Sequence, residues 1–176
     1  MRLSIMLFFF VSNLFAQKII YTITKTDNTQ YKAETYNTKF KKFKFTTTDG
    51  QELEMAYNQL GSIEYFENRY KKLKPENITL KFIRFSERNG VLMKVLKEGK
   101  CNLYVHEFQY LHYYVLRKDE HIATPIYLKQ TISNNFKKTA LEYFKDCKKV
   151  TDKIKKKEFW KKNIPEMVEY YNSNCE

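Results

Sequence analysis

The segment from Val91 to Val105 constrains the fold most, because it has the pattern of a buried β-hairpin. Two apolar runs flank the tripeptide Lys97-Glu98-Gly99. In a three-residue hairpin loop the last residue takes a positive φ, which glycine adopts without steric cost. The sequence therefore predicts two antiparallel strands with Gly99 in a G1 bulge.

The length of that loop decides which residues lie opposite each other. With three loop residues, the pairs on one face are all apolar: Val95 with Cys101, Met93 with Leu103, and Val91 with Val105. A two-residue loop would instead set Val95 opposite Asn102. We therefore expect the longer loop and a hairpin that is buried on this face.

A second hairpin is predicted around the tripeptide Thr48-Asp49-Gly50 by the same reasoning. A three-residue loop gives chemically matched pairs: Phe45 with Leu53, Phe43 with Met55, and Lys44 with Glu54. A two-residue loop would place Phe45 against Glu54. Both hairpins therefore favour the same type of turn.

Other segments also alternate in the manner of strands and are separated by turn residues. They cover residues 18–24, 31–36, 61–66, 78–85, 108–115 and 121–128. In the segment from Ile78 to Phe85 the apolar residues change parity, which indicates a bulge or a strand buried on both faces. Residues 18–130 are therefore predicted to form a β-rich body.

After Ser133, a credible N-cap, the apolar period changes from two to about 3.6 residues. One helical face then carries Phe136, Ala140, Tyr143, Phe144, Cys147 and Val150. A final short helix near Pro165 gathers Ile164, Val168, Tyr171 and Cys175 on one face. The predicted fold class is α+β, an antiparallel sheet or partly open barrel of hairpins followed by a helical C-terminal subdomain, residues 131–176.

The three cysteines predict one disulfide and a third thiol that stays free or pairs with a partner. Two buried thiols in place of the disulfide are the alternative, which export makes less favourable. Cys147 and Cys175 lie 28 residues apart on the apolar faces of two successive predicted helices that must pack together. A bond between them would contribute roughly 3 to 4 kcal/mol through the entropy of the unfolded chain. Cys101 is then expected to be a small buried residue beside Val95.

Residues 1–17 have the pattern of a secretory signal peptide. Arg2 is their only charge, an apolar run follows it, and Ala16 offers a small residue before Gln17. The run is too short for a membrane anchor, and no later segment has the apolar length of a transmembrane helix. We expect an exported protein of the periplasm, outer envelope or extracellular space.

The formal net charge of +12 favours anionic partners. An envelope protein or an anionic glycolipid would fit such a surface. The charge comes mostly from lysine, and no cluster of arginines is present, so we expect no specific nucleic-acid site. A solvated lysine-rich surface accounts for the same charge without any partner.

The histidines suggest a metal site, but their spacing argues against one. His106 and His112 are six residues apart in strand-like sequence, and in one continuous strand they would lie about 20 Å apart. A turn near Glu107-Phe108 would bring them closer. No nucleophile motif or phosphate-binding loop is present, so we expect no catalytic residue, metal or cofactor. The alternative is a hydrolase assembled from distant residues, with His106, His112 or His121 beside a carboxylate or hydroxyl.

Aromatic residues offer two candidate interaction surfaces. The first is a set of rings that would bind carbohydrate or protein: Tyr104, Tyr110, Tyr113, Tyr114 and Trp160. Tyrosine is also an ordinary strand residue, so core and sheet positions explain the first four equally. The second is the basic segment Lys153–Lys162, which would lie on an anionic membrane or form a solvated helix with its aromatics docked on the β-rich body.

Several segments recur together in one known group of proteins. They are Phe43-Lys44-Phe45 with Asp49-Gly50, Val91 to Tyr104 with its Glu98-Gly99 turn, Asp146-Cys147, and Tyr170-Tyr171-Asn172 ahead of Cys175. In these the chain resembles a family of small exported proteins of unknown function from the Bacteroidetes. The resemblance implies an envelope location, supports the pairing of Cys147 with Cys175 and carries over no catalytic residue. We therefore expect a non-catalytic binding or structural module of the cell envelope.

Overall fold

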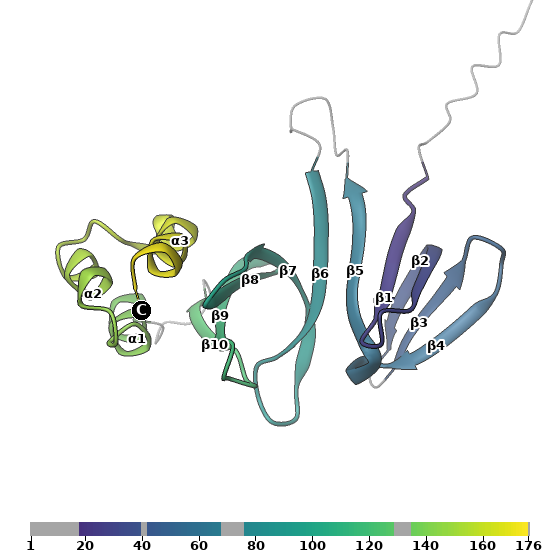
Figure 1. Ribbon diagram of the computed structural model, residues 1–176, viewed down its shortest axis with the longest axis horizontal. Helices are drawn as coiled ribbons and strands as arrows, with labels where there is room; N and C mark the ends of the chain where they lie inside the picture. The colour runs from purple at the N-terminus through teal and green to yellow at the C-terminus, as the bar shows by residue number, and fades with distance from the viewer. Residues whose placement is uncertain (1–17, 40–41, 68–75, 129–134, 176) are drawn as a thin grey trace, which may run out of the picture.

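A computed structural model describes residues 18–39, 42–67, 76–128 and 135–175. The fold is α+β, as predicted: ten antiparallel strands form one open sheet, and helices follow at the C-terminus (Figure 1). The predicted signal peptide, residues 1–17, and the predicted N-cap Ser133 lie outside the described residues.

The strands are β1 (Tyr21–Lys25), β2 (Gln30–Lys39), β3 (Lys42–Thr47), β4 (Glu52–Ala56), β5 (Leu60–Glu67), β6 (Glu76–Arg84), β7 (Gly90–Lys97), β8 (Cys101–Phe108), β9 (Tyr110–Arg117) and β10 (Thr124–Leu128). The helices are the 3₁₀ turn η1 (Tyr57–Gln59), α1 (Phe136–Tyr143), α2 (Lys148–Lys155), the 3₁₀ turn η2 (Lys161–Asn163) and α3 (Ile164–Asn174). Across the sheet the order is β10-β9-β8-β7-β6-β5-β1-β2-β3-β4. Chain neighbours therefore pair throughout, except that β5 returns to β1.

The β3–β4 hairpin has the predicted register. Phe45 pairs with Leu53, Phe43 with Met55, and Lys44 with Glu54. Gly50 has a φ of 87°, so glycine supplies the conformation that the G1 bulge requires. The apolar pairs of this hairpin lie on the buried side, where Phe43 is fully enclosed.

The predicted register of the β7–β8 hairpin is wrong. Val95 pairs with Tyr104 and Lys94 with Val105, and an irregularity follows between Val95 and Lys97. Gly99 does not have a positive φ. Glycine is needed at this position for another reason. A Cβ on residue 99 would lie 2.5 Å from the side-chain nitrogen of Asn172 in α3, so only a residue without a side chain fits.

The N-terminal half of the sheet buries one face, and its C-terminal strands bury both. Three apolar groups define them: an N-terminal cluster (Ile23, Ala33, Phe43, Phe45, Met55, Leu60, Ile63), a central cluster (Ile83, Met93, Tyr104, Tyr114, Ala123), and a helix cluster in which Cys101, Leu103, Val115 and Ile126 meet the three helices. The N-terminal and helix clusters lie on one face and the central cluster on the other. β6 serves both, because Leu80 packs on the N-terminal cluster and Ile83 belongs to the central one. The parity change in this strand therefore reflects burial on both faces.

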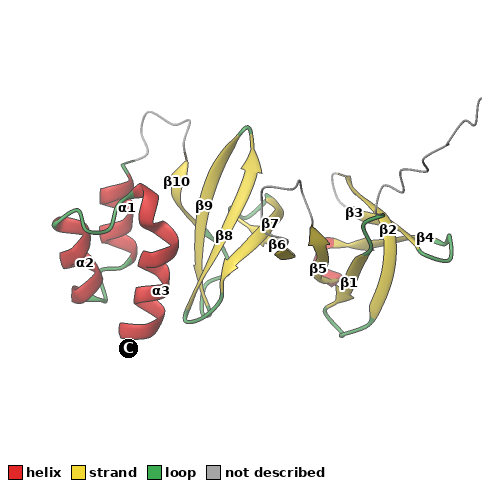
Figure 2. Cartoon of the chain, turned by 90° about the horizontal axis from the view of Figure 1, so that it is seen from above, coloured by secondary structure: helices red, strands yellow, loops and turns green. Residues whose placement is uncertain are grey.

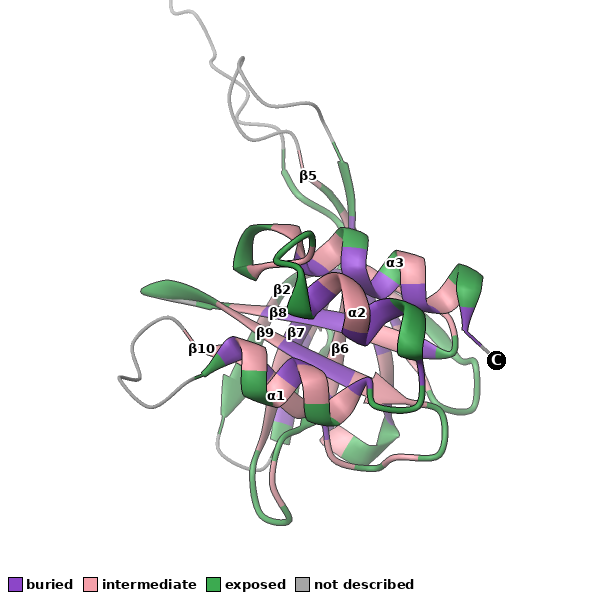
Figure 3. Cartoon of the chain, turned by 90° about the vertical axis from the view of Figure 1, so that its left-hand side faces the viewer, coloured by how far each residue is buried: buried purple, intermediate pink, exposed green. Residues whose placement is uncertain are grey.

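The helical region forms two helices where the periodicity predicts one. α1 ends at Tyr143 and α2 begins at Lys148. The residues predicted on the apolar face, among them Phe136, Phe144 and Val150, are nevertheless buried, except for Tyr143, which is partly buried. Asn135 caps α1 by accepting a hydrogen bond from the Lys138 amide. Pro165 occupies the first turn of α3, as predicted. The three helices pack on one side of the C-terminal strands (Figure 2), and their buried residues face the sheet (Figure 3).

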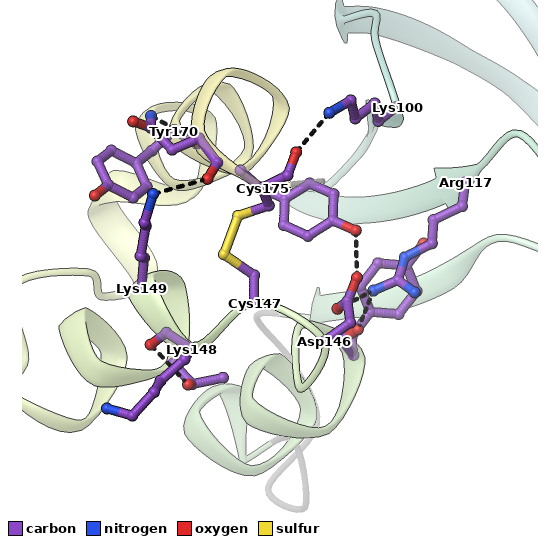
Figure 4. Close-up of a disulfide and its surroundings, with 12 residues drawn as sticks. Lys100, Arg117, Asp146, Cys147, Lys148, Lys149, Tyr170 and Cys175 are labelled. Atoms are coloured by element: carbon purple, nitrogen blue, oxygen red, sulfur yellow. Dashed lines mark hydrogen bonds and ion pairs between the residues drawn. A yellow bond between two sulfur atoms is a disulfide. The ribbon is translucent and has the colours of Figure 1, made fainter.

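The predicted disulfide between Cys147 and Cys175 is present and joins the start of α2 to the end of α3 (Figure 4). Polar contacts beside it attach the helices to the sheet. The Arg117 guanidinium of β9 contacts the Asp146 carboxylate at 2.7 Å, and the Tyr171 hydroxyl donates to the same carboxylate at 2.6 Å. Cys101 is a free thiol and is buried, as predicted. It does not lie beside Val95, because Cys101 belongs to the helix cluster and Val95 packs on the central cluster, on the other face of the sheet.

Candidate binding groove

A groove of about 800 Å³ opens over the middle of the sheet. Its floor comes from β6 and β7, and its walls come from the end of β2 with η1 and from the end of β8. The lining residues are Tyr36, Thr38, Lys39, Tyr57, Tyr65, Glu67, Glu76, Ile78, Leu80, Phe82, Arg88, Asn89, Gly90, Val91, Leu92, Lys94, Val105, His106 and Glu107. This volume is in the range of ordinary ligand sites.

The register of the sheet explains why a groove lies here. Residues opposite each other on neighbouring strands share a face, so one row crosses the sheet through Ile23, Ile63, Leu80, Lys94, Val105, Tyr113 and Tyr127. One end of the row is covered by the N-terminal cluster and the other by the helices. Lys94, in the middle, is covered by neither. The groove is therefore the uncovered middle of a sheet face whose two ends are buried.

Lys94 crosses the floor toward the start of β6. Its ammonium forms an ion pair with the Glu76 carboxylate at 2.5 Å, and its side chain is 22% exposed. The aliphatic part of a lysine can cover an apolar strand while the charged end stays in water. The pair therefore places one positive and one negative group at the same end of the groove.

Aromatic rings form one wall. Tyr57 of η1 stacks on Phe82 of β6 with ring centroids 4.3 Å apart, and its hydroxyl donates to the Lys39 carbonyl oxygen. Tyr36 meets the edge of Tyr21 at 5.0 Å. Burial raises the pKa of both Tyr36 and Tyr57, so both hydroxyls stay protonated and can donate or accept hydrogen bonds at neutral pH.

The charges of the groove are balanced. Its described lining contains three carboxylates, Glu67, Glu76 and Glu107, and three cations, Lys39, Arg88 and Lys94. The whole chain carries +12. The groove thus departs from the strongly basic character of the whole chain. A balanced lining favours neither anionic nor cationic ligands.

The aromatic residues predicted as a binding surface do not form one surface, although Tyr104 and Tyr114 pair across β8 and β9. Tyr104 and Tyr114 are buried in the central cluster, and Tyr113 packs on the opposite face against the helix cluster. Trp160 meets Phe136 at 5.6 Å, and Tyr110 is 40% exposed beside the β8–β9 turn. Alternation along a strand sends neighbouring tyrosines to opposite faces, which explains the separation.

The histidines are closer than one continuous strand would allow. The chain turns at Gln109, which has a φ of 57°, and His106 of β8 pairs directly with His112 of β9. Burial is the main cause of a lowered pKa at His106, and the nearby His112 adds to it. His121 lies exposed in the β9–β10 turn. In the described ranges, no group of three or more His, Cys, Asp or Glu side chains is placed to hold a metal ion.

A second polar cluster, near the disulfide, has a structural role. The Tyr143 hydroxyl donates to Glu120 at 2.6 Å, and the Arg117 guanidinium lies 4.8 Å from the centre of the Tyr143 ring. Burial raises the pKa of the Cys101 thiol to about 12. A thiol with this pKa is a poor nucleophile at neutral pH, so the cluster fixes α1 and α3 to β9 rather than offering a reactive group.

Comparison of the chain with protein-family models, with curated proteins and with solved structures found no match. The resemblance to exported Bacteroidetes proteins therefore stays a prediction. Among the described residues, no helix combines the length and apolar character needed to cross a membrane.

Sequence reasoning missed most of the groove, because its residues come from strands that are far apart in the chain. One signal was the parity change in β6, which marked a strand that contributes to both faces. Lys94 in an otherwise apolar run was a second sign, since a charged side chain in a doubly buried strand needs a partner or an opening.

Proposed function

We propose that this protein is a non-catalytic, exported binding module of the cell envelope, and that its ligand is a neutral oligosaccharide held in the groove. The observation that carries the proposal is the lining itself, in which aromatic rings and charge-balanced polar groups surround an apolar floor. The C–H faces of sugar rings stack on aromatic side chains, while carboxylates, amides and cations bind the hydroxyl groups. The disulfide supports export, because such bonds persist in oxidising compartments.

Calorimetric titration of the chain from Lys18 with neutral tetrasaccharides of glucose and of N-acetylglucosamine tests this function. Acidic oligosaccharides and a short zwitterionic peptide provide the comparison. We expect a neutral glycan to bind most tightly, and Tyr57→Ala to weaken it about tenfold, the equivalent of ~1.4 kcal/mol. Tyr110→Ala removes an exposed tyrosine outside the groove and serves as the matched control.

Tighter binding of the peptide or of the acidic glycans would contradict the proposed ligand class. Equal effects of the two tyrosine substitutions would contradict the site. Thermal unfolding of both variants separates lost binding from lost folding.

The alternative function, a hydrolase, rests on His106, which lies in the groove wall next to Glu107. A hydrolase would cleave the bound glycan and lose turnover in His106→Asn. Product analysis after prolonged incubation distinguishes the two functions, because a binding module returns the oligosaccharide intact.

A further inference from the structure

The excess positive charge of the helical region gathers around the end of α2. Residues 145–162 contain nine lysines and three acids, a local net charge of +6. We define the basic end as five exposed lysines in and after the last turn of α2: Lys155, Lys156, Lys157, Lys161 and Lys162.

The acids of this segment are already paired with other groups. Asp152 binds Lys148 at 2.6 Å, Glu158 binds Lys153 at 2.7 Å, and Asp146 binds Arg117. Lys155, Lys156, Lys157 and Lys162 form no ion pair with any described residue. Lys155 and Lys156 interact only at longer range with Asp152 and Glu158, which are already paired with other lysines. Most of this positive charge is therefore available to an anionic partner.

The aromatic residues of the same segment point toward the protein. Trp160 contacts Phe136 edge to face, and Phe159 contacts Tyr170 at 5.5 Å. The predicted helix ends at Lys155, and both rings pack against the helix cluster, with ring contacts to α1 and α3. No aromatic anchor of this segment is left to enter a bilayer, so attraction at the basic end is electrostatic.

The basic end is remote from the groove. The helices occupy one end of the long axis of the molecule and β4 the other, and the groove-forming strands β6 and β7 lie between them (Figure 1). A partner that covers the end of α2 therefore leaves the groove open.

From these observations we infer that the basic end is a docking surface for an anionic lipid bilayer. Lysine ammonium groups act as separate point charges, and laterally mobile lipid phosphates can adjust to them. Arginine, which provides the planar fork favoured for nucleic acid, is missing from residues 145–162. α2 has eight residues and offers no long basic helix to follow a groove of DNA.

Vesicle co-sedimentation of the chain from Lys18 tests this inference. Vesicles of pure phosphatidylcholine are compared with vesicles containing phosphatidylglycerol, at low and at raised salt. Each lysine near an anionic surface contributes about fivefold to binding, so the triple variant Lys155→Gln, Lys156→Gln and Lys157→Gln should lose on the order of 100-fold. The matched control, Lys42→Gln, Lys44→Gln and Lys81→Gln, removes the same charge from the sheet and should bind as the parent does.

The inference is supported if binding needs phosphatidylglycerol, weakens with salt and is lost only in the variant with Lys155, Lys156 and Lys157 changed to glutamine. Equal losses in the two triple variants would overturn it, because net charge alone would then explain binding. Tighter binding to duplex DNA than to vesicles at equal phosphate concentration would also overturn it. Oligosaccharide binding by this triple variant at residues 155–157, measured in parallel, should be unchanged.

Discussion

At the scale of single residues, Asn172 performs a task that a neighbouring strand usually performs. Its side-chain oxygen accepts a hydrogen bond from the Cys101 amide at 2.8 Å, and its side-chain nitrogen donates to the Cys101 carbonyl at 2.9 Å. These bonds satisfy both backbone groups of the first residue of β8. Gly99 permits the contact, because any larger residue would occupy the space of the Asn172 amide.

We predict that Asn172→Ala lowers the free energy of unfolding by about 2 to 4 kcal/mol, because two partly buried backbone groups lose their partners. Urea unfolding measures this loss. The matched control is Asn174→Ala, which removes an exposed side-chain amide two residues later in α3. It should lower the free energy of unfolding by less than about 1 kcal/mol.

Gly99→Ala should also destabilise the fold, since its new Cβ would displace the Asn172 amide. The double variant with Asn172→Ala should cost clearly less than the sum of the two single changes, because both act on one contact. Additive effects in this double-mutant cycle would contradict the proposed coupling between turn and helix.

Cys101 provides a prediction about pH. Its pKa is raised to about 12, mainly by burial, whereas the thiol of the unfolded chain loses its proton near 9.0. Between these values the unfolded state binds fewer protons, so stability falls as pH rises through this range and is fully present below it. Cys101→Ala should flatten part of that loss in urea titrations from pH 8 to 11. If the free energy of unfolding of the variant falls with pH as steeply as that of the parent, Cys101 is not a source of this pH dependence.

At the scale of elements, the quality of the predictions depended on where the deciding contact lies. The β3–β4 register follows from Gly50 and from its immediate neighbours, so counting along the sequence was sufficient. The β7–β8 hairpin is held by Asn172, which is more than 70 residues away from Cys101. The register of this hairpin also shifts between Val95 and Lys97, where Val95 packs on the central cluster and Leu96 on the helix cluster. Such contacts have no local signature.

The break between α1 and α2 has a similar explanation. The 3.6-residue period runs through the break and identifies the buried residues correctly. Between the two helices, Asp146 binds Arg117 and Tyr171, and Cys147 forms the disulfide. These partners belong to β9 and α3, so the interruption could not be predicted from the periodicity alone.

The disulfide should supply a large share of the stability of the helical region. Cys147→Ser with Cys175→Ser, or a reducing agent, should lower the free energy of unfolding by roughly 3 to 4 kcal/mol. Thermal unfolding with and without reductant measures the loss. Cys101→Ser keeps the bond and should remain sensitive to reductant, whereas the double serine variant should not respond to it.

At the scale of the whole molecule, two separate surfaces are present: the groove on the sheet and the basic end on the helical region. The N-terminal half of the sheet buries one face, its C-terminal strands bury both, and β6 and β7 leave the groove between the covered regions. The basic end belongs to the helical region, at the end of α2 and between α2 and α3. A molecule attached to a bilayer through the basic end would therefore keep the groove uncovered.

Methyl NMR during titration with the neutral tetrasaccharide that binds best tests the central claim most directly. If the groove is the binding site, the methyl resonances of Leu80, Leu92 and Val105 should shift with saturating ligand, while those of Ile126 and Val150 in the helix cluster stay in place. Shifts confined to the helix cluster, or none at any of the three groove residues, would contradict it.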